Sequence, residues 1–481
     1  MKSEDLYYLS ACEMAEKIKS QELSSEEITE KIIERIEKIN PIINAFCTYT
    51  FDFARENAKK ADMAVKQGEN LGLLHGVPIS IKDETDTKGI RTTYGCKIFE
   101  NNIPRKDEAI VRRIRDAGAL ILGKTNTPSF GYKGETDNLI FGITRNPWNL
   151  ERTPGGSSGG AGAAVISGLG PIGMGSDGGG SIRIPSSFCG LFGIKTTYGR
   201  IPHGIMQEMG NIGTLVQKGP LVRHVKDAAL VLDAIVGQDD SDRYSVPKPN
   251  YSYLRKLNEI PKSLKIGYSL DIGTTDALDP EVERNVMDGI QKFEEIGWLS
   301  TKSKLKLKNP NSLFTTIWSS GFAHTLAPYL DEWQDRMEPD LVRLLYSGLK
   351  RSAKELKIAE VQREMVFTTI CRALKKIDVL ITPTLACPAF ELGKSLVTNE
   401  ETNETGIIIN GKKISATGWL FTYPFNLSGH PVVSIPCGFS KDGLPIGMQI
   451  IGQRFDELTL LQVSQKFEEL ASWQDRKPKF E

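Results

Sequence analysis

The chain has 481 residues, of which 40% are apolar and 25% charged, a composition typical of folded globular proteins. Its 60 Lys and Arg residues balance its 60 Asp and Glu residues, so the net charge gives no reason to expect nucleic acid or an anionic membrane as a partner. No run of about 18 apolar residues argues for a transmembrane helix, and the polar start of the chain leads us to expect no secretory signal.

The cysteines and histidines indicate the redox environment of the protein and whether it binds zinc. The seven cysteines are scattered and form no Cys-x-x-Cys pair, so we expect reduced thiols in a cytoplasmic protein. The five histidines include no His-x-x-x-His pair, so we expect no zinc site.

The first forty residues have a helical pattern. Ser24 and Glu27 match a capping box, the arrangement that typically begins a helix. Isoleucines then recur at helical spacing up to Asn40-Pro41. We therefore predict a helix that begins near Ser24, ends near Asn40 and packs on a core through its isoleucines.

From about residue 74 the pattern alternates between strands and helices. Residues 76–82 predict a strand that ends in Lys82, and residues 109–118 predict a helix. Residues 119–122 predict a second strand, and the alanine-rich residues 161–168 predict a buried helix. Such alternation is typical of an α/β fold with a largely parallel sheet covered by helices.

The later part of the chain is more polar. Residues 240–375 are rich in charge and in helical patterns, and residues 396–413 predict an exposed excursion. Strand-like segments return at 378–382 and 431–436. Length alone suggests about three domains, but late strands that pair with early ones favour one large domain, residues 1–481.

Two glycine clusters, each containing serine, occupy residues 155–160 and 177–183. Glycine permits positive φ angles and close approach of the backbone, so such segments let peptide N–H groups converge on an anion. Serines within them lie where a nucleophile would meet a carbonyl whose oxygen becomes negative. The combination indicates acyl transfer and requires a base elsewhere in the chain.

Two generic motifs compete for these glycines. Gly173-x-Gly175-x-x-Gly178 fits a dinucleotide-binding pattern, but no acidic residue follows about twenty positions later. No Gly-Lys-Ser/Thr follows a glycine run, which excludes a P-loop. Serines 157 and 158 both fit the nucleophile elbow of α/β-hydrolases, with His324 or His430 as the base, but this leaves Ser181 unexplained.

Lys82 is the third candidate base. It ends an apolar strand, so its side chain should enter a partly buried region, where burial lowers the pKa of a lysine. A neutral Lys82 could take a proton from one serine that in turn takes the proton of a second. The alternative is a lysine at a strand end that is exposed or salt-bridged.

With these residues in view, the chain closely resembles the amidase signature family. The resemblance covers most of the chain and is weakest over residues 240–375. The stretches that carry it are residues 76–83, 154–160, 175–185, 188–196, 426–431 and 443–449. It implies an α/β fold with a large mixed central sheet of about ten or more strands, covered by helices on both faces, and a core signature region at about 74–200.

The resemblance also implies a triad. Ser181 would be the nucleophile, Ser157 would follow a cis peptide bond and bridge to Lys82, and Lys82 would be the base. The N–H groups of Gly178, Gly179, Gly180 and Ser181 would form the oxyanion hole, and water would hydrolyse the acyl-enzyme. No cofactor and no metal are implied.

Further residues receive supporting roles. Ser158 would orient its neighbours through hydrogen bonds, and Asp177 and Arg183 would form a structural pair that holds the second glycine cluster. By family analogy, the backbone of Gly131 would face the substrate.

The substrate is constrained by what surrounds these motifs. Family members that use glutamine, the A subunits of tRNA-dependent amidotransferases, carry an acidic residue a few positions before Pro-x-Asn-Leu, and residues 417–422 contain none. Trp419 favours an apolar or aromatic acyl group, with plain core packing as its alternative. Gly178 resembles members acting on hydrophobic or linear 6-aminohexanoate-type amides. Trp318, Phe322 and Trp333 are candidates to line the acyl pocket.

We therefore predict an amidase that acts on a small-molecule carboxamide in the cytoplasm, without nucleic-acid or membrane partners. The alternative is the glutamine-hydrolysing A subunit of a tRNA-dependent amidotransferase. An inactive scaffold is disfavoured because all three triad residues are present. The resemblance makes a homodimer the oligomer to expect, while the sequence itself leaves the oligomeric state open.

Overall fold

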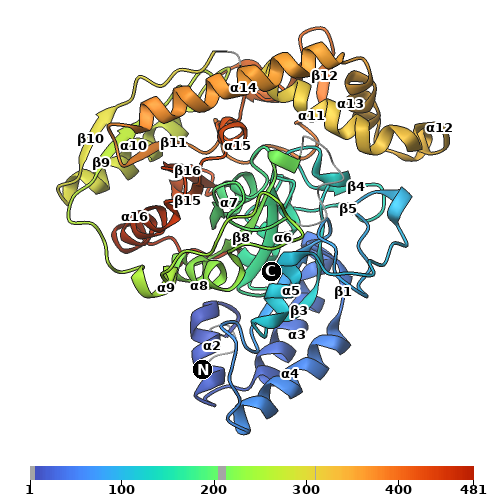
Figure 1. Ribbon diagram of the computed structural model, residues 1–481, viewed down its shortest axis with the longest axis vertical. Helices are drawn as coiled ribbons and strands as arrows, with labels where there is room; N and C mark the ends of the chain where they lie inside the picture. Colours follow the sequence, from blue (N-terminus) through green and yellow to red (C-terminus); the bar gives the residue numbers. More distant parts are fainter. Residues whose placement is uncertain (1–5, 204–212, 309, 481) are drawn as a thin grey trace.

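A mixed sheet forms the centre of the computed structural model, which describes residues 6–203, 213–308 and 310–480 (Figure 1). The sheet has 11 strands, and four of its ten pairings in the described part of the chain are parallel. In spatial order they are β1 (Phe46–Tyr49), β3 (Leu120–Thr125), β2 (Pro78–Lys82), β6 (Ile172–Asp177), β8 (Gln217–Val222), β7 (Phe192–Lys195), β15 (Val432–Phe439), β16 (Pro445–Gly452), β11 (Val379–Pro383), β9 (Lys265–Tyr268) and β10 (Leu299–Lys302). The predicted large mixed sheet is confirmed, whereas the expectation of largely parallel pairing was wrong.

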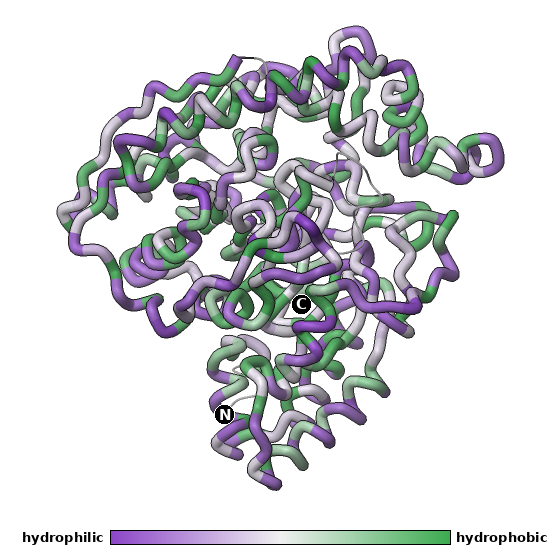
Figure 2. Tube along the Cα trace, viewed as in Figure 1, coloured by the Kyte–Doolittle hydropathy of each residue, from purple (hydrophilic) through white to green (hydrophobic). Residues whose placement is uncertain are grey.

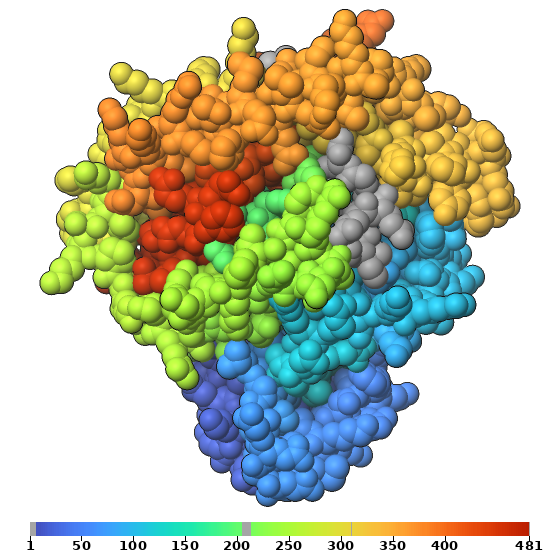
Figure 3. All heavy atoms as spheres, in the orientation of Figure 1, coloured from blue at the N-terminus to red at the C-terminus, as the bar shows by residue number. Residues whose placement is uncertain are grey.

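Helices cover both faces of this sheet. They are α2 (Ala11–Lys19), α3 (Ser25–Ile43), α4 (Phe51–Lys66), α5 (Ala109–Asp116), α6 (Gly159–Ile166), α7 (Arg183–Cys189), α8 (Val225–Ile235), α9 (Tyr253–Lys256), α10 (Pro280–Glu295), α11 (Pro310–Leu326), α12 (Leu330–Trp333), α13 (Pro339–Leu349), α14 (Ala353–Leu374), α15 (Pro424–Ser428) and α16 (Glu457–Leu470). Figure 3 shows α11–α14, in yellow and orange, as a continuous cover over one side of the molecule.

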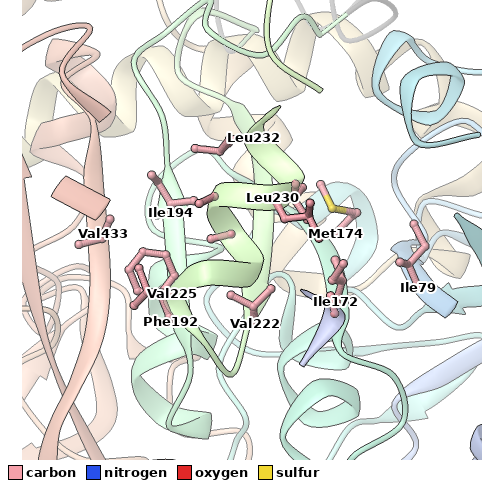
Figure 4. Packing of buried hydrophobic residues seen from close by; sticks show 14 of the residues in the cluster. Ile79, Ile172, Met174, Phe192, Ile194, Val222, Val225, Leu230, Leu232 and Val433 are labelled. Carbon is pink, nitrogen blue, oxygen red and sulfur yellow. The ribbon is translucent and has the colours of Figure 1, made fainter. Parts of the chain in front are cut away.

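The core follows the alternation of side chains along the strands. Val379 and Ile381 of β11 belong to the core beneath α8, α10 and α16, while Leu380 between them belongs to the core on the other face. Figure 4 shows side chains of α8 packed with those of β7 and β8. Since strands buried on both faces need apolar residues at successive positions, the short apolar runs in the sequence were recognisable as strands.

The N-terminal helix differs in length from the prediction. Ser24 Oγ accepts the predicted cap hydrogen bond from the Glu27 N–H, but α3 continues past Pro41 to Ile43. It ends where Asn44 adopts a left-handed conformation and donates its N–H to the Asn40 carbonyl. Pro41 has no N–H to donate, so α3 loses one helical hydrogen bond in its last turn and ends two residues later. Hydrophobic and hydrophilic residues alternate along α3, as expected for a helix with one buried face (Figure 2).

Residues 396–413 form more structure than the predicted excursion. They build most of a small antiparallel sheet of β12 (Val397–Asn399), β13 (Glu404–Ile409) and β14 (Lys412–Ser415). Asn410 and Gly411, both at positive φ, connect β13 to β14, as in a tight hairpin. Alternate residues of β13 are buried, so this segment packs against the protein on one face.

The predicted helices of residues 240–375 are present as α9–α14. The region also supplies β9 and β10, which pair in parallel at one edge of the central sheet. These strands have four residues each, and β10 is largely exposed, so neither carries an apolar run that the sequence could reveal.

Candidate active site

Two parallel strands and one loop bring the predicted residues together. β2 and β6 are parallel neighbours, so Lys82 at the end of β2 and Asp177 at the end of β6 lie at the same edge of the sheet. Ser157 lies in the glycine loop just before α6, which packs on both strands. The second glycine cluster continues from β6 to Ser181 and into α7.

Lys82 is buried and contacts two serines. Its Nζ donates hydrogen bonds to Ser157 Oγ at 2.6 Å and to Ser176 Oγ at 2.7 Å. The peptide bond between Gly156 and Ser157 is cis, as the family resemblance implied. Ser158, the neighbouring serine, hydrogen-bonds through Oγ with the backbone of Ser176, in keeping with the orienting role predicted for it.

Ser181 lies at the junction of two cavities. With Ser157, Ser176 and Glu84 it lines a narrow recess of about 10 Å³, and it also lines a larger cavity of about 510 Å³. The N–H of Ser158 donates to the Ser181 carbonyl at 3.2 Å, which connects the two glycine loops directly. A substrate in the larger cavity would therefore meet Ser181 at its inner end.

The glycines before Ser181 lie so close to neighbouring side chains that a Cβ at these positions would clash. A Cβ on Gly178 would lie 2.9 Å from the Trp318 ring, and one on Gly180 would lie 2.4 Å from Thr422 Oγ1. In the described part of the chain, the N–H groups of residues 178–181 donate no hydrogen bond to protein atoms. Unpaired N–H groups on such a turn suit the binding of a developing oxyanion.

Asp177 and Arg183 form the structural pair predicted for this loop. Arg183 Nε donates to Asp177 Oδ2 at 2.9 Å, and both side chains are fully buried. Arg183 also donates to Asn426 Oδ1, and the Asn426 amide donates back to Asp177. Burial would raise the pKa of Asp177, but Arg183 and Asn426 lower it to about 2. The carboxylate therefore stays charged and fixes the turn.

Glu84 and Ser176 were missed by the sequence reasoning. Glu84 Oε2 is 2.7 Å from Lys82 Nζ, and both side chains are buried. Burial lowers the pKa of Lys82 most strongly, and the Glu84 charge acts in the opposite direction without reversing the result. Ser176 lay within a recognised motif, whereas nothing in the sequence shows that a carboxylate two residues beyond a strand-end lysine contacts the lysine amine.

Gly131 passes directly over the serine–lysine pair. It has a φ of +70°, and a Cβ there would lie 2.6 Å from Glu84 Oε2 and 2.8 Å from Ser157 Oγ. A glycine is therefore required at this position by both conformation and space. Because Gly131 lines both cavities, the structure brings it to the site that the family analogy predicted.

Trp419 combines the two alternatives that the sequence left open. Its ring is 1% exposed and packs against Phe188 and Phe390, so it is a core residue. It also lines the 510 Å³ cavity that contains Ser181. The residue is thus a fixed wall that a substrate would touch.

The three aromatic candidates from residues 240–375 do not all lie at the same cavity. Trp318 lines both the cavity and the recess, and Phe322 lines the recess. Trp333 lines a separate surface hollow with Lys97 and Arg336, so its prediction as a pocket residue was wrong. Trp333 falls on α12, which follows a turn after α11 and so no longer continues the face that bears Trp318.

The competing motif interpretations do not fit this geometry. Gly173 and Gly175 lie within β6 rather than in a turn between a strand and a helix, as a dinucleotide site requires. His430 Nδ1 pairs with Ser428 Oγ, and burial lowers the pKa of His430 to about 3. His324 is exposed on α11. The side chain that contacts Ser157 is instead Lys82.

Two kinds of feature are absent from the described residues. Within residues 6–203, 213–308 and 310–480, no group of three or more His, Cys, Asp or Glu side chains is arranged to hold a metal ion. Over the same ranges, no helix has the length and apolar character needed to cross a membrane.

Comparison with known proteins identifies the family. The Amidase family model matches residues 27–461, and the chain belongs to this amidase signature family of amide hydrolases. It is 38% identical to an acylamidase of Rhodococcus erythropolis, over 99% of this chain and 98% of that protein. It is 36% identical to the A subunit of the glutamyl-tRNA(Gln) amidotransferase from Sulfurihydrogenibium sp., over 98% of this chain and 99% of that protein.

Solved structures agree with this assignment. A bacterial aryl acylamidase of the amidase signature family superimposes with a TM-score of 0.90 at 30% identity, covering 97% of each chain. A 6-aminohexanoate cyclic dimer hydrolase gives a TM-score of 0.89 at 29% identity, covering 98% of this chain and 99% of that one. The fold class and the family resemblance predicted from the sequence are confirmed.

Proposed function

We propose that this amidase hydrolyses a carboxamide to a carboxylic acid and ammonia or an amine through an acyl-enzyme on Ser181. The observation that carries the proposal is the buried 2.6 Å hydrogen bond from Lys82 to Ser157 beside Ser181, at the inner end of a 510 Å³ cavity. A buried lysine with a lowered pKa can act as a base near neutral pH.

The proposed acylation runs along the serine–lysine contacts. Ser181 Oγ attacks the amide carbon while its proton passes to Ser157 Oγ and the Ser157 proton passes to Lys82. The N–H groups of residues 178–181 hold the oxyanion, where one such donor is typically worth about 3–4 kcal/mol. Lys82 then returns a proton through Ser157 to the leaving nitrogen, the C–N bond breaks, and water attacks the ester by the same route.

The acyl group is proposed to be apolar, aromatic or linear aliphatic. Trp419, Trp318, Phe314 and Ile184 line the cavity, and aromatic walls suit apolar groups. The acylamidase relative and the two neighbouring structures support this class of amide.

The second candidate function is glutamine hydrolysis within a tRNA-dependent amidotransferase, which the relative from Sulfurihydrogenibium favours. A glutamine site needs a free carboxylate for the α-amine. The carboxylates among the described lining residues, Asp340 and Glu400, both face Arg343. We therefore retain the amidase as the better supported function.

Other features complete the proposal. Residues 1–481 would form one domain, supported by β1 and β16, which belong to the same sheet. A reducing, cytoplasmic location is supported by seven free cysteines among the described residues. A homodimer stays a prediction.

The test is the release of ammonia or amine from glutamine, aliphatic amides, benzamide, an anilide and a 6-aminohexanoate oligomer. We expect turnover of the apolar amides by the unaltered enzyme and none by Ser181→Ala or Lys82→Ala. Glutamine as the single substrate would favour the amidotransferase alternative. Activity that survives in Ser181→Ala would overturn the mechanism.

A further inference from the structure

A second buried lysine lies behind Lys82. Lys218 Nζ is 3.8 Å from Glu84 Oε1, while Lys82 Nζ is 2.7 Å from Glu84 Oε2. One carboxylate thus lies between two lysines, and the exposure of all three side chains is at most 4%. Lys218 also lies 3.6 Å from Glu108 and donates to Thr85 Oγ1 at 2.9 Å.

Strand register explains how Lys218 reaches this position. β8 is antiparallel to β6, and Lys218 is directly opposite Ser176 in the ladder. Directly opposed residues in an antiparallel pair project from the same face of the sheet. Since Ser176 Oγ accepts a hydrogen bond from Lys82, the register places Lys218 on the face occupied by Lys82.

The charges facing Lys82 act in opposite directions. Glu84 and the more distant Asp177 stabilise its protonated form, and Lys218 destabilises it. Beyond Lys218 lie His203, whose pKa burial lowers to about 4, and Glu108, whose pKa burial raises to about 7. Glu84 favours the ammonium form of Lys82, which cannot accept a proton, and burial and Lys218 both oppose that form.

We propose that Glu84 and Lys218 are positioning residues for Lys82: Glu84 anchors its amine beside Ser157, and Lys218 shares the Glu84 carboxylate so that Lys82 can give up its proton. When Lys82 is neutral, the negative charge of Glu84 is balanced by the positive charge of Lys218. With Lys82 protonated, two cations share one carboxylate. The inference rests on the proposed role of Lys82 as the base, and it adds what sets the strength of that base.

The proposal predicts pH shifts of opposite sign. Ser181 reacts only when Lys82 is neutral, so its reactivity rises with pH through the pKa of Lys82. Glu84→Gln removes the stabilising anion and should move this rise to lower pH, while Lys218→Met removes the opposing cation and should move it to higher pH. An opposite charge in direct contact shifts a pKa by about 1–3 units, which is the displacement we expect for Glu84→Gln, and Lys218→Met should give a shift of opposite sign.

Phenylmethanesulfonyl fluoride serves as the probe, because it needs no knowledge of the natural amide. Ser181 Oγ forms a bond to its sulfur, fluoride leaves, and the hydroxyl proton passes through Ser157 to Lys82. The measurement is the second-order rate of sulfonylation from pH 5 to 10, followed by intact-mass spectrometry. Wild type, Glu84→Gln, Lys218→Met and the conservative variant Glu84→Asp, which should restore the wild-type position, are compared.

Lys124→Met is the matched control. Lys124 is an equally buried lysine, on β3, and it donates to oxygens of Thr85, Thr87 and Thr92 rather than to Glu84 or the serines. We expect lost stability without a shift of the pH profile. If a single variant does not fold, the double variant Glu84→Gln/Lys218→Met is measured instead. It removes both charges of the pair, so neither is left buried without its partner. Its profile should lie near wild type, with labelling slower by roughly 10- to 100-fold because the amine of Lys82 loses its anchor.

The proposed function and the roles of Glu84 and Lys218 fail under different outcomes. Labelling that persists in Ser181→Ala would overturn the proposed function itself. Labelling confined to Ser181, with unshifted profiles or shifts of the same sign in Glu84→Gln and Lys218→Met, would overturn the present inference alone. A double variant labelled at the wild-type rate would also overturn it.

Discussion

The inner and outer parts of the candidate site are built in different ways. The inner part consists of Lys82, Ser157, Ser176 and Glu84, which are buried side chains on or beside two parallel strands. The outer part is a 510 Å³ cavity walled by α11, α13 and residues 395–420. Under the proposed function, the groups that need closely fixed positions lie at strand ends and in the glycine loops beside them, whereas the groups that would contact the acyl part of the substrate lie mostly on helices and beside a small sheet. We therefore expect mutations to affect bond cleavage and acyl preference separately.

The largest expected effect is at the inner part. Lys82→Met should lower kcat/KM about 10²–10⁴-fold for every amide that is turned over, because a general base contributes a factor of that size. The measurement is initial rates across the amide panel, with circular dichroism to verify the fold. A loss confined to one class of amide would contradict the separation between inner and outer parts.

The next effect concerns the support of the inner part. Asp177→Asn should lower the free energy of unfolding by about 3–5 kcal/mol at pH 7, because Arg183 loses its buried partner. Urea unfolding measures this, and comparable stability of the variant would show that the pair does not hold the turn.

The same carboxylate predicts a pH dependence. Because the folded-state pKa of Asp177 is lowered from 3.8 to about 2, its stabilisation is present above pH 4 and is lost as the pH falls toward 2. Wild type should lose about 2 kcal/mol through this group, and Asp177→Asn should lack that loss. Equal slopes between pH 4 and 2 would contradict the assignment.

The outer part should respond differently. Trp318→Ala should raise KM for amides with bulky apolar acyl groups by roughly 10- to 200-fold, with little change for acetamide, because its ring lines the cavity. Trp333→Ala is the matched control, since Trp333 lies in a separate hollow. Equal effects of the two variants would argue against the cavity as the acyl site.

The smallest expected effect is at Gly178, where the inner and outer parts meet. A Cβ on Gly178 would lie 2.9 Å from Trp318 and 3.0 Å from Val216, so Gly178→Ala should cost about 1–3 kcal/mol of transition-state stabilisation through crowding. Combining it with Trp318→Ala should recover part of the loss measured as kcat/KM. Purely additive losses would mean that the crowding lies elsewhere.

The sequence predicted the fold where its pattern was local. β2, β3 and α6 were recognisable because apolar or alanine-rich runs of the right length follow one another. β9 and β10 were missed because a strand of four residues in a charged region has no clear period. The β12–β14 sheet was missed because the residue types along β13 do not follow its alternating burial: the polar Thr405 is buried and the apolar Ile408 is exposed.

The candidate site shows the same division. Lys82, Ser157 and Ser181 lie in long motifs, so the sequence could predict them as site residues, and the structure brings Lys82 and Ser157 into direct contact. Lys218 could not be found, because its place beside Glu84 depends on the register of β8 against β6. Trp333 was misassigned because aromatic residues in a helical region do not reveal which way the next helix turns.

The most direct test of the central claim is to locate the acyl group during turnover. The best amide of the panel is mixed with wild type, Ser181→Ala and Ser157→Ala, quenched in acid, digested and analysed by mass spectrometry. Wild type should carry an acyl group on the peptide that contains Ser181, and Ser181→Ala should carry none. An acyl group on Ser157 or Ser158, or full turnover by Ser181→Ala, would contradict the central claim.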